Sequence, residues 1–427
     1  MCMYKSYFFI LGFLLLSSLN LFGQILNIDS VIIQIDKSYP ELQMYELQIK
    51  AFDTYATGAK AWEAPQVGTG FFMTPYNTKF WSPNPMDIKG IPSMNPGMGT
   101  YMFQVQQMIP NPSRQRANQK YMQGMSDVER ENKNVMRNQL IAEAKKNYYD
   151  WIVLKKKQKI VSNIESLMKY IIESSESRYA YQQEKLSTIY KAKSELLKIN
   201  NMQIMLENDS REKMIELNRL MNRDKNIQFA IDTVYTIKEY DKDMTDTAAI
   251  IGFRSDIKVL EKNVQVARLK QQYEYSKRKP DFGIRYDHMF SFGENPNLFS
   301  LMGMVSIPIA PWSSKMYKSN VAGLNYELEA YQKQKESIVN EVSGELQMLR
   351  TQIANKKRQI KLYETGIIPA LQKNYKTTLL AYEQNTEDLF IVLDAVQNLQ
   401  MTQIEYLDQL QGLLQLQVEY EKQIEQK

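Results

Sequence analysis

Cysteine and histidine are almost absent from this sequence of 427 residues, which has one of each, Cys2 and His288. The chain therefore lacks the residues for a disulfide framework, a cysteine nucleophile or a zinc site built from histidine and cysteine. It also lacks a glycine-rich phosphate loop ahead of a helix. We expect no enzymatic activity and no cofactor, and we assign no residue as a metal ligand.

Glycine and proline are scarce as well, with 17 and 14 residues, and the mean hydropathy is −0.46. Few helix breakers in a long polar chain predict long helices with solvent-exposed faces. The net charge is +5, and no basic cluster with interleaved aromatic residues occurs. Nucleic acid is therefore not an expected partner.

A long apolar run occurs near the start of the chain. Lys5 precedes the apolar residues 8–19, and Gly23 is a small residue at the predicted end. This pattern is typical of a secretory signal peptide, so we predict that residues 1–23 direct export; a retained membrane anchor is the alternative. Because Cys2 lies in this segment, the exported chain has no cysteine to carry a disulfide or a lipid. A periplasmic or outer-membrane location fits both features.

Residues 281–309 predict a β-hairpin. Side chains alternate strictly over residues 281–292, and one face carries Phe282, Ile284, Tyr286, His288, Phe290 and Phe292. A second alternating run, residues 299–309, follows a short turn. A tilted strand of about 9 to 11 residues crosses a bilayer, and alternation of apolar and polar faces is typical of a membrane β-barrel. The hairpin of a soluble β-sandwich fits the alternation too.

A second hairpin is predicted over residues 66–109, with strands at 66–75 and 100–109 and a loop rich in proline, glycine and methionine between them. Ahead of it, apolar residues recur at helical spacing over residues 28–62. We interpret this stretch as one helix that is broken near Pro40.

Long helical segments follow each hairpin. Apolar residues recur every three or four positions over residues 113–179 and again over residues 313–382. We expect the first helix to turn near Glu184 and return to Arg223. The second should turn near Asn385 and return to Tyr420. Helices of this length can reach roughly 100 Å at about 1.5 Å per residue.

The two halves of the chain share this plan. Residues 39–42, 65, 109–110 and 180–181 correspond in order to residues 254–257, 280, 307–308 and 381–382. An ordered set of matches indicates an internal duplication. We therefore predict a signal peptide, a first repeat, an equatorial linker and a second repeat, at residues 1–23, 24–223, 224–246 and 247–427.

Four strands are too few for a membrane barrel, because the smallest bacterial outer-membrane barrels have about eight strands and an open sheet edge cannot face lipid. The chain must therefore oligomerise. Two copies would supply eight strands and three copies would supply twelve. The long helices, with narrow apolar seams between polar residues, would fit a ring around a wet channel.

Nearly the whole exported chain resembles the TolC-like outer-membrane efflux proteins. The residues that carry the resemblance are the two proline-bounded hairpins and the segments 39–42, 217–223, 254–257, 368–370 and 382–395. The resemblance implies a mainly α-helical homotrimer with a twelve-stranded β-barrel in the lipid of the outer membrane and a helical coiled-coil tunnel in the periplasm. It also implies a periplasmic adaptor protein and an inner-membrane pump of the resistance-nodulation-division or ABC type.

The resemblance also places the channel constriction at the helical tips. Tyr382 and Asp394 match the family pattern there, and Glu387 and Asp388 are weaker candidates for the constriction. Asn385 and Glu184 stand where the family has glycine, and we predict that they contact the adaptor. Asparagine tolerates a left-handed turn and glutamate does so poorly, so the first tip should turn differently. A surface position for Asp394 without any role in the pore is the alternative.

Methionine is frequent in and beside the first loop, at Met86, Met94, Met98, Met102 and Met108. Thioether sulfur is a soft ligand that suits Cu(I), whereas methionine also fills irregular gaps in apolar cores. The loop resembles that of the heavy-metal export branch of the family. Both interpretations of these residues stay open.

The sequence thus predicts a passive exit duct of a tripartite efflux system that carries metal cations or small toxic molecules. An outlet of a type I protein secretion system is an alternative with the same architecture. A periplasmic coiled-coil scaffold without a pore is a second alternative, which requires hairpins that face water.

Overall fold

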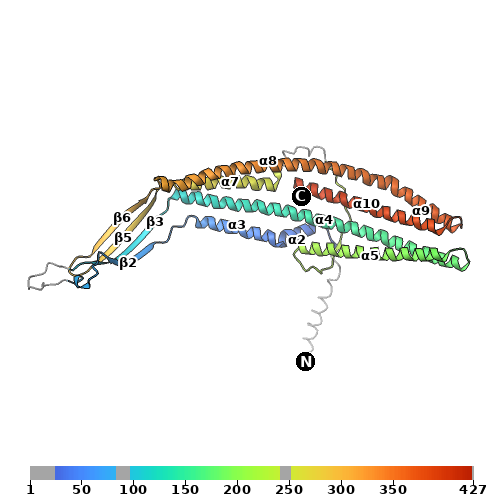
Figure 1. Cartoon of the computed structure of the whole chain (residues 1–427), viewed down its shortest axis with the longest axis horizontal. Helices are drawn as coiled ribbons and strands as arrows, with labels where there is room; N and C mark the ends of the chain where they lie inside the picture. The colour runs from blue at the N-terminus through green and yellow to red at the C-terminus, as the bar shows by residue number, and fades with distance from the viewer. Residues whose placement is uncertain (1–24, 83–96, 241–251, 426–427) are drawn as a thin grey trace, which may run out of the picture. The chain divides into compact units, whose positions relative to one another are not determined.

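The computed structural model describes residues 25–82, 97–240 and 252–425, and these are mostly helical (Figure 1). The predicted signal peptide, Met86, Met94 and the end of the predicted linker lie outside the described residues. The described residues form two compact units, the first from residues 25–44, 132–240, 252–257 and 337–425 and the second from residues 45–82, 97–131 and 258–336. Each unit takes residues from both predicted repeats, and the division into repeats stays a prediction.

The second unit contains one antiparallel sheet with the strand order β2-β3-β5-β6. The strands are β2 (Gln66–Phe72), β3 (Thr100–Ile109), β5 (Asp281–Ser291) and β6 (Leu298–Ser306). Both predicted hairpins are confirmed, and pairing of β3 with β5 joins them, as Figure 1 shows. Two strands are shorter than predicted. β2 ends before Met73, whose φ of 47° is left-handed, and β6 ends before Pro308, which has no amide hydrogen for the ladder.

The helices of the second unit lie at one end of this sheet. They are α7 (Ser255–Ser276), most of α3 (Pro40–Gly58), and the first turns of α4 (Pro112–Ala180) and α8 (Pro311–Leu362). Both long helices begin at a proline, which suits the first helical position because no hydrogen bond is lost there. Gly124 lets α4 approach α7 closely, since a Cβ atom at this position would lie 2.9 Å from Leu269. The short η1 (Thr78–Phe80) follows β2.

The first unit is built from the remaining parts of α4 and α8 and from further helices. These are α2 (Ile28–Ser38), α5 (Leu186–Leu220), α9 (Ile368–Glu383) and α10 (Leu389–Ile424). The predicted break near Pro40 is confirmed, because Tyr39 is extended ahead of the proline. The second long helix was expected to be continuous, but a π-helical turn, η3 (Tyr363–Ile367), separates α8 from α9. A short parallel pair, β1 (Ile25–Leu26) with β4 (Ala230–Ile231), was not predicted.

The core of the first unit consists of separate apolar clusters along the helices. One cluster, near the helical turns, joins the two helical hairpins through Val161, Ile171, Ala192, Leu389 and Val392. Another packs α2 against α4 and α5 through Ile35, Ile152 and Leu217. A third packs α8 against α10 through Leu346 and Leu410. A long, thin bundle therefore replaces a single globular core.

Candidate functional site

The sheet has one apolar and one polar face. Because side chains of paired residues lie on the same face, the register places these apolar side chains together: Val67, Phe71, Phe103, Phe282, Ile284, Phe290, Phe299, Leu301 and Val305. All are exposed, Leu301 to 67% and Phe299 to 72%. The opposite face carries Gln104, Gln106, Ser300 and an ion pair in which Arg285 donates to Asp287 at 2.8 Å. An exposed apolar face opposite a polar one is typical of strands between lipid and a wet lumen.

The outer strands of this sheet, β2 and β6, each have a neighbour on one side only among the described residues. Their free amide and carbonyl groups cannot face lipid without a large free-energy cost. In lipid, both edges of such a sheet would need further strands as partners.

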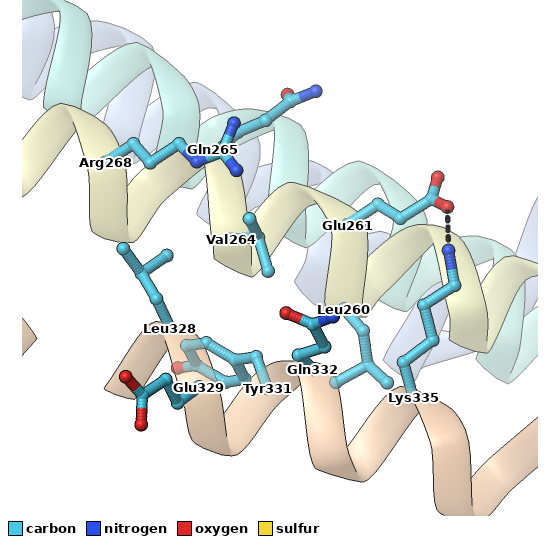
Figure 2. Close-up of a pocket in the computed structure, with 10 residues that line it drawn as sticks. All are labelled: Leu260, Glu261, Val264, Gln265, Arg268, Leu328, Glu329, Tyr331, Gln332 and Lys335. Atoms are coloured by element: carbon cyan, nitrogen blue, oxygen red, sulfur yellow. Dashed lines mark hydrogen bonds and ion pairs between the residues drawn. The ribbon is translucent and has the colours of Figure 1, made fainter. Parts of the chain in front are cut away.

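A groove of about 480 Å³ lies between α7 and α8 in the second unit (Figure 2). Val264 and Leu328 lie on either side of it, and Glu261 and Lys335 bridge one end through an ion pair of 2.7 Å. No histidine, cysteine or serine lines the groove. Its amphipathic lining suits packing of another helix better than chemistry.

The two helical turns of the first unit have the same backbone geometry. Asn385 is left-handed with a φ of 59°, as predicted, but in the first turn the left-handed residue is Gln182, with a φ of 60°. The amide of residue 183 donates to the carbonyl of Arg178, as the amide of Thr386 does to Ala381. This is a Schellman motif in both turns.

The prediction that the first turn differs from the second was therefore wrong, and so were two residue assignments. Glu184 is not the residue at the glycine-like position, and Tyr382 corresponds to Tyr179 instead of Tyr181. A left-handed glutamine and a left-handed asparagine in the same motif leave little sequence signal, since glycine is the residue that marks such a position.

Tyr382 connects the two turns. Its ring is buried, and its hydroxyl lies 3.2 Å from the hydroxyl of Ser175 and donates to the carboxylate of Glu184 at 3.1 Å. Arg178 donates to the carbonyl oxygens of Tyr382 and Glu383 at 2.8 and 2.9 Å. Its guanidinium also lies 4.3 Å from the centre of the Tyr382 ring. Burial raises the pKa of Tyr382, so the hydroxyl stays protonated and keeps donating.

Comparison with solved structures identifies the fold. VceC from Vibrio cholerae, an outer membrane protein, is 14% identical and matches with a TM-score of 0.71 over 93% of this chain and 95% of that chain. The open-state outer membrane channel MtrE from Neisseria gonorrhoeae is 11% identical, with a TM-score of 0.70 over 93% and 88%. The outer membrane channel CmeC from Campylobacter jejuni is 12% identical, with a TM-score of 0.70 over 93% and 85%. The chain has the fold of the TolC-like outer-membrane channels. No protein-family model and no curated protein sequence matches it.

Within this fold, the residues predicted for the constriction and those predicted for adaptor contact lie in different surroundings. Tyr382 and Glu184 are in contact through their hydrogen bond. Asp394 is exposed on α10 and accepts a hydrogen bond from Asn398 at 2.9 Å. Asp388 caps the first turn of α10 by accepting from the amide of Phe390 at 2.8 Å. The predicted roles of these residues, and of Glu387 and Asn385, stay predictions.

Sequence reasoning missed Arg178 and Ser175, which bind Tyr382 from the first helical hairpin. Both lie among other polar residues on a long helix, and their spacing gives no signal. It also missed Lys191, whose ammonium group lies 3.4 Å from the centre of the Phe390 ring, one helical turn before Asp394.

An ion cluster around the buried Glu421 connects the predicted linker, at Lys238 and Tyr240, to the helices α4 and α10 of the first unit. Glu421 on α10 accepts from Lys145 on α4 at 2.7 Å and from Lys238 at 2.6 Å. Tyr240 donates to the same carboxylate at 3.3 Å. Burial opposes ionisation of Glu421, but the hydrogen bonds from both lysines outweigh burial and lower the pKa of this carboxyl. Burial and the charge of Glu421 raise the pKa of Tyr240.

Within the described ranges, no group of three or more histidine, cysteine, aspartate and glutamate residues could hold a metal ion. None of the helices in the described part of the chain is long and apolar enough to span a membrane.

Proposed function

We propose that this chain is the outer-membrane exit duct of a tripartite efflux system. The observation that carries the proposal is the sheet with an exposed apolar face, a polar face and two unpaired edges, in a chain with the fold of outer-membrane channels. Lipid covers the apolar face and the polar face lines the lumen. The protein does no chemistry, and its work is to keep a polar path open through the outer membrane.

Three copies close the barrel. Pairing β2 of one copy with β6 of the next satisfies both edges and gives a barrel of about twelve strands, within the range of outer-membrane barrels. The helices continue the lumen into the periplasm, where the grooves and polar faces of neighbouring copies meet. The non-pore scaffold is disfavoured by the exposed apolar face, which would be a large aggregation-prone patch in water.

The helical turns at residues 181–185 and 384–388 are the ends at which a periplasmic adaptor binds. An inner-membrane pump of the resistance-nodulation-division or ABC type supplies the energy. The cargo consists of metal cations or small toxic molecules. The pump that co-purifies with the chain would separate this function from type I protein secretion.

The direct test is to purify the protein from outer membranes in detergent, measure its oligomeric mass and record conductance in planar bilayers. We expect a trimer with discrete conductance steps. A protein that is extracted without detergent and forms no channel would disprove the duct and favour the scaffold.

A matched pair of variants on β6 tests which face meets lipid. Leu301 and Ser300 are neighbours on opposite faces. We expect Leu301→Arg to reduce the yield of trimer in the outer membrane, because arginine on the lipid face costs about 2–4 kcal/mol near the bilayer centre. Ser300→Arg should be tolerated because the lumen is wet. Equal yields of the two variants, measured by heat-modifiable gel mobility, would contradict the assignment of the faces.

The Asp394 carboxylate tests the predicted constriction. Three such carboxylates around a narrow lumen would concentrate cations, so Asp394→Asn should lower cation preference and weaken block by divalent cations. Asp209→Asn, at an exposed position on α5, is the matched control and should change neither. Reversal potentials in asymmetric salt measure the effect. Unchanged selectivity would remove Asp394 from the constriction.

A further inference from the structure

Methionine side chains gather on the polar face of the sheet. The register pairs Met102 on β3 directly with Met289 on β5. It also places Met108 on β3 and Met304 on β6 on either side of Gly283. The sequence suggested Met102 and Met108 through their closeness to the first loop, but gave no reason to connect them with methionines on the second hairpin.

Gly283 gives the second pair its geometry. A Cβ atom at this position would lie 2.6 Å from the sulfur of Met108 and 3.1 Å from the methyl carbon of Met304. The two thioether side chains therefore fold over the glycine from both neighbouring strands and converge above it. Any other residue at position 283 would displace the Met108 sulfur.

The two methionine pairs lie along one line of the polar face. Gly283 and Met289 are six positions apart on β5, or about 20 Å at about 3.3 Å per residue. Between them lies Arg285, whose charge is neutralised by Asp287 at 2.8 Å. Met302 pairs with Arg285 on the same face and adds a thioether between the pairs. No unpaired cation of the sheet thus stands between the two sites.

We propose that the Met102/Met289 pair and the Met108/Met304 pair are binding sites for soft monovalent cations, Cu(I) or Ag(I). Thioether sulfur selects such ions over harder cations. Because the ligands are neutral and few, each site binds weakly, and a path of several weak sites lets an ion enter and leave. The inference rests on the proposed duct insofar as it names the class of cargo. Binding of the ion itself requires only the folded sheet.

The test measures binding of Ag(I), and of Cu(I) under reducing conditions, to the purified full chain in detergent by competition with a chromophoric chelator. Variants M102L/M289L and M108L/M304L remove one pair each, and leucine conserves the volume. We expect each double variant to lose roughly tenfold in apparent affinity, which equals about 1.4 kcal/mol, and the quadruple variant to lose silver binding altogether. Zn(II) should not compete.

Matched controls separate the sheet from other methionines. M205L/M348L changes residues exposed on α5 and α8 and should bind silver as the wild type does. M86L/M94L makes the same substitution at two methionines of the first loop and should also bind silver as the wild type does. Loss of binding in this loop variant alone would overturn the proposal, as would full binding in the quadruple variant, which would leave the four methionines as packing residues. X-ray absorption gives an independent readout, since bound silver should show sulfur neighbours only in chains that keep a pair.

Failure of this inference and failure of the proposed function give different results. Conductance and trimer mass of the wild-type preparation test the duct. Silver binding by the same preparation tests the thioether sites. A conducting trimer that binds no silver would overturn the sites alone, whereas a soluble monomer that binds silver would overturn the duct alone.

Discussion

Replacing Glu421 by glutamine is expected to destabilise the first unit by about 3–5 kcal/mol, the usual effect of removing one partner of a buried ion pair. The carboxylate side chain is 6% exposed and that of Lys145 is 11% exposed, so water cannot replace the lost charge. Lys238 and Tyr240 donate to the same carboxylate, and a glutamine would offer these donors one neutral acceptor oxygen in place of two charged ones. The midpoint of denaturant unfolding, followed by circular dichroism of the long helices, measures the effect.

The same carboxylate predicts a pH dependence. The folded pKa of Glu421 is lowered, so its stabilisation is fully present above the unfolded pKa, about 4.3, and is lost as the pH falls through the folded value. Glu421→Gln should remove this part of the acid sensitivity. The control is Glu336→Gln, which breaks the exposed pair with Lys333 and should leave the midpoint unchanged. Equal midpoints for both variants would contradict a stabilising role for the cluster.

The strands and their faces could be predicted from the sequence because a period of two is a strong signal when one face is mainly apolar. Phe282, Ile284 and Phe290 mark that face without any tertiary information. The joining of the two hairpins through β3 and β5 could not be predicted. Residues 100–109 and 281–291 are far apart in the sequence, and β2 and β6 have edges that could equally have paired with the other hairpin. The methionine pairs depend on that register and were hidden for the same reason.

For the helical turns, the sequence predicted the positions but not the detailed conformation. Their positions followed from helical periodicity, but the residue that adopts the left-handed conformation did not, since Gln182 and Asn385 lack the mark that glycine provides. The contacts of Tyr382 were equally hidden. Arg178 and Ser175 reach it across two hairpins, and no spacing rule on one helix reports a partner on another.

Replacing Arg178 by alanine is expected to open the proposed duct at its periplasmic end. Arg178 supplies two charged hydrogen bonds to the second turn and a cation–π contact with Tyr382. Charged hydrogen bonds contribute about 1.5–3 kcal/mol each, and partial exposure lowers this contribution. If the bonds exist only while the turns are held together, a loss of about 3 kcal/mol raises the ratio of open to closed turns by roughly a hundredfold.

Single-channel recording checks this expectation, because a duct held shut at its turns should show long closed periods that shorten in Arg178→Ala. Tyr382→Phe removes the hydroxyl contacts with Ser175 and Glu184 but keeps the ring and both Arg178 bonds, so its effect should have the same sign and be smaller. Arg211→Ala, at an exposed position on α5, controls for the loss of an arginine. If Arg178→Ala and Arg211→Ala gave the same open probability, the contact between the turns would only stabilise the helical bundle, and the constriction would have to be sought at Asp394.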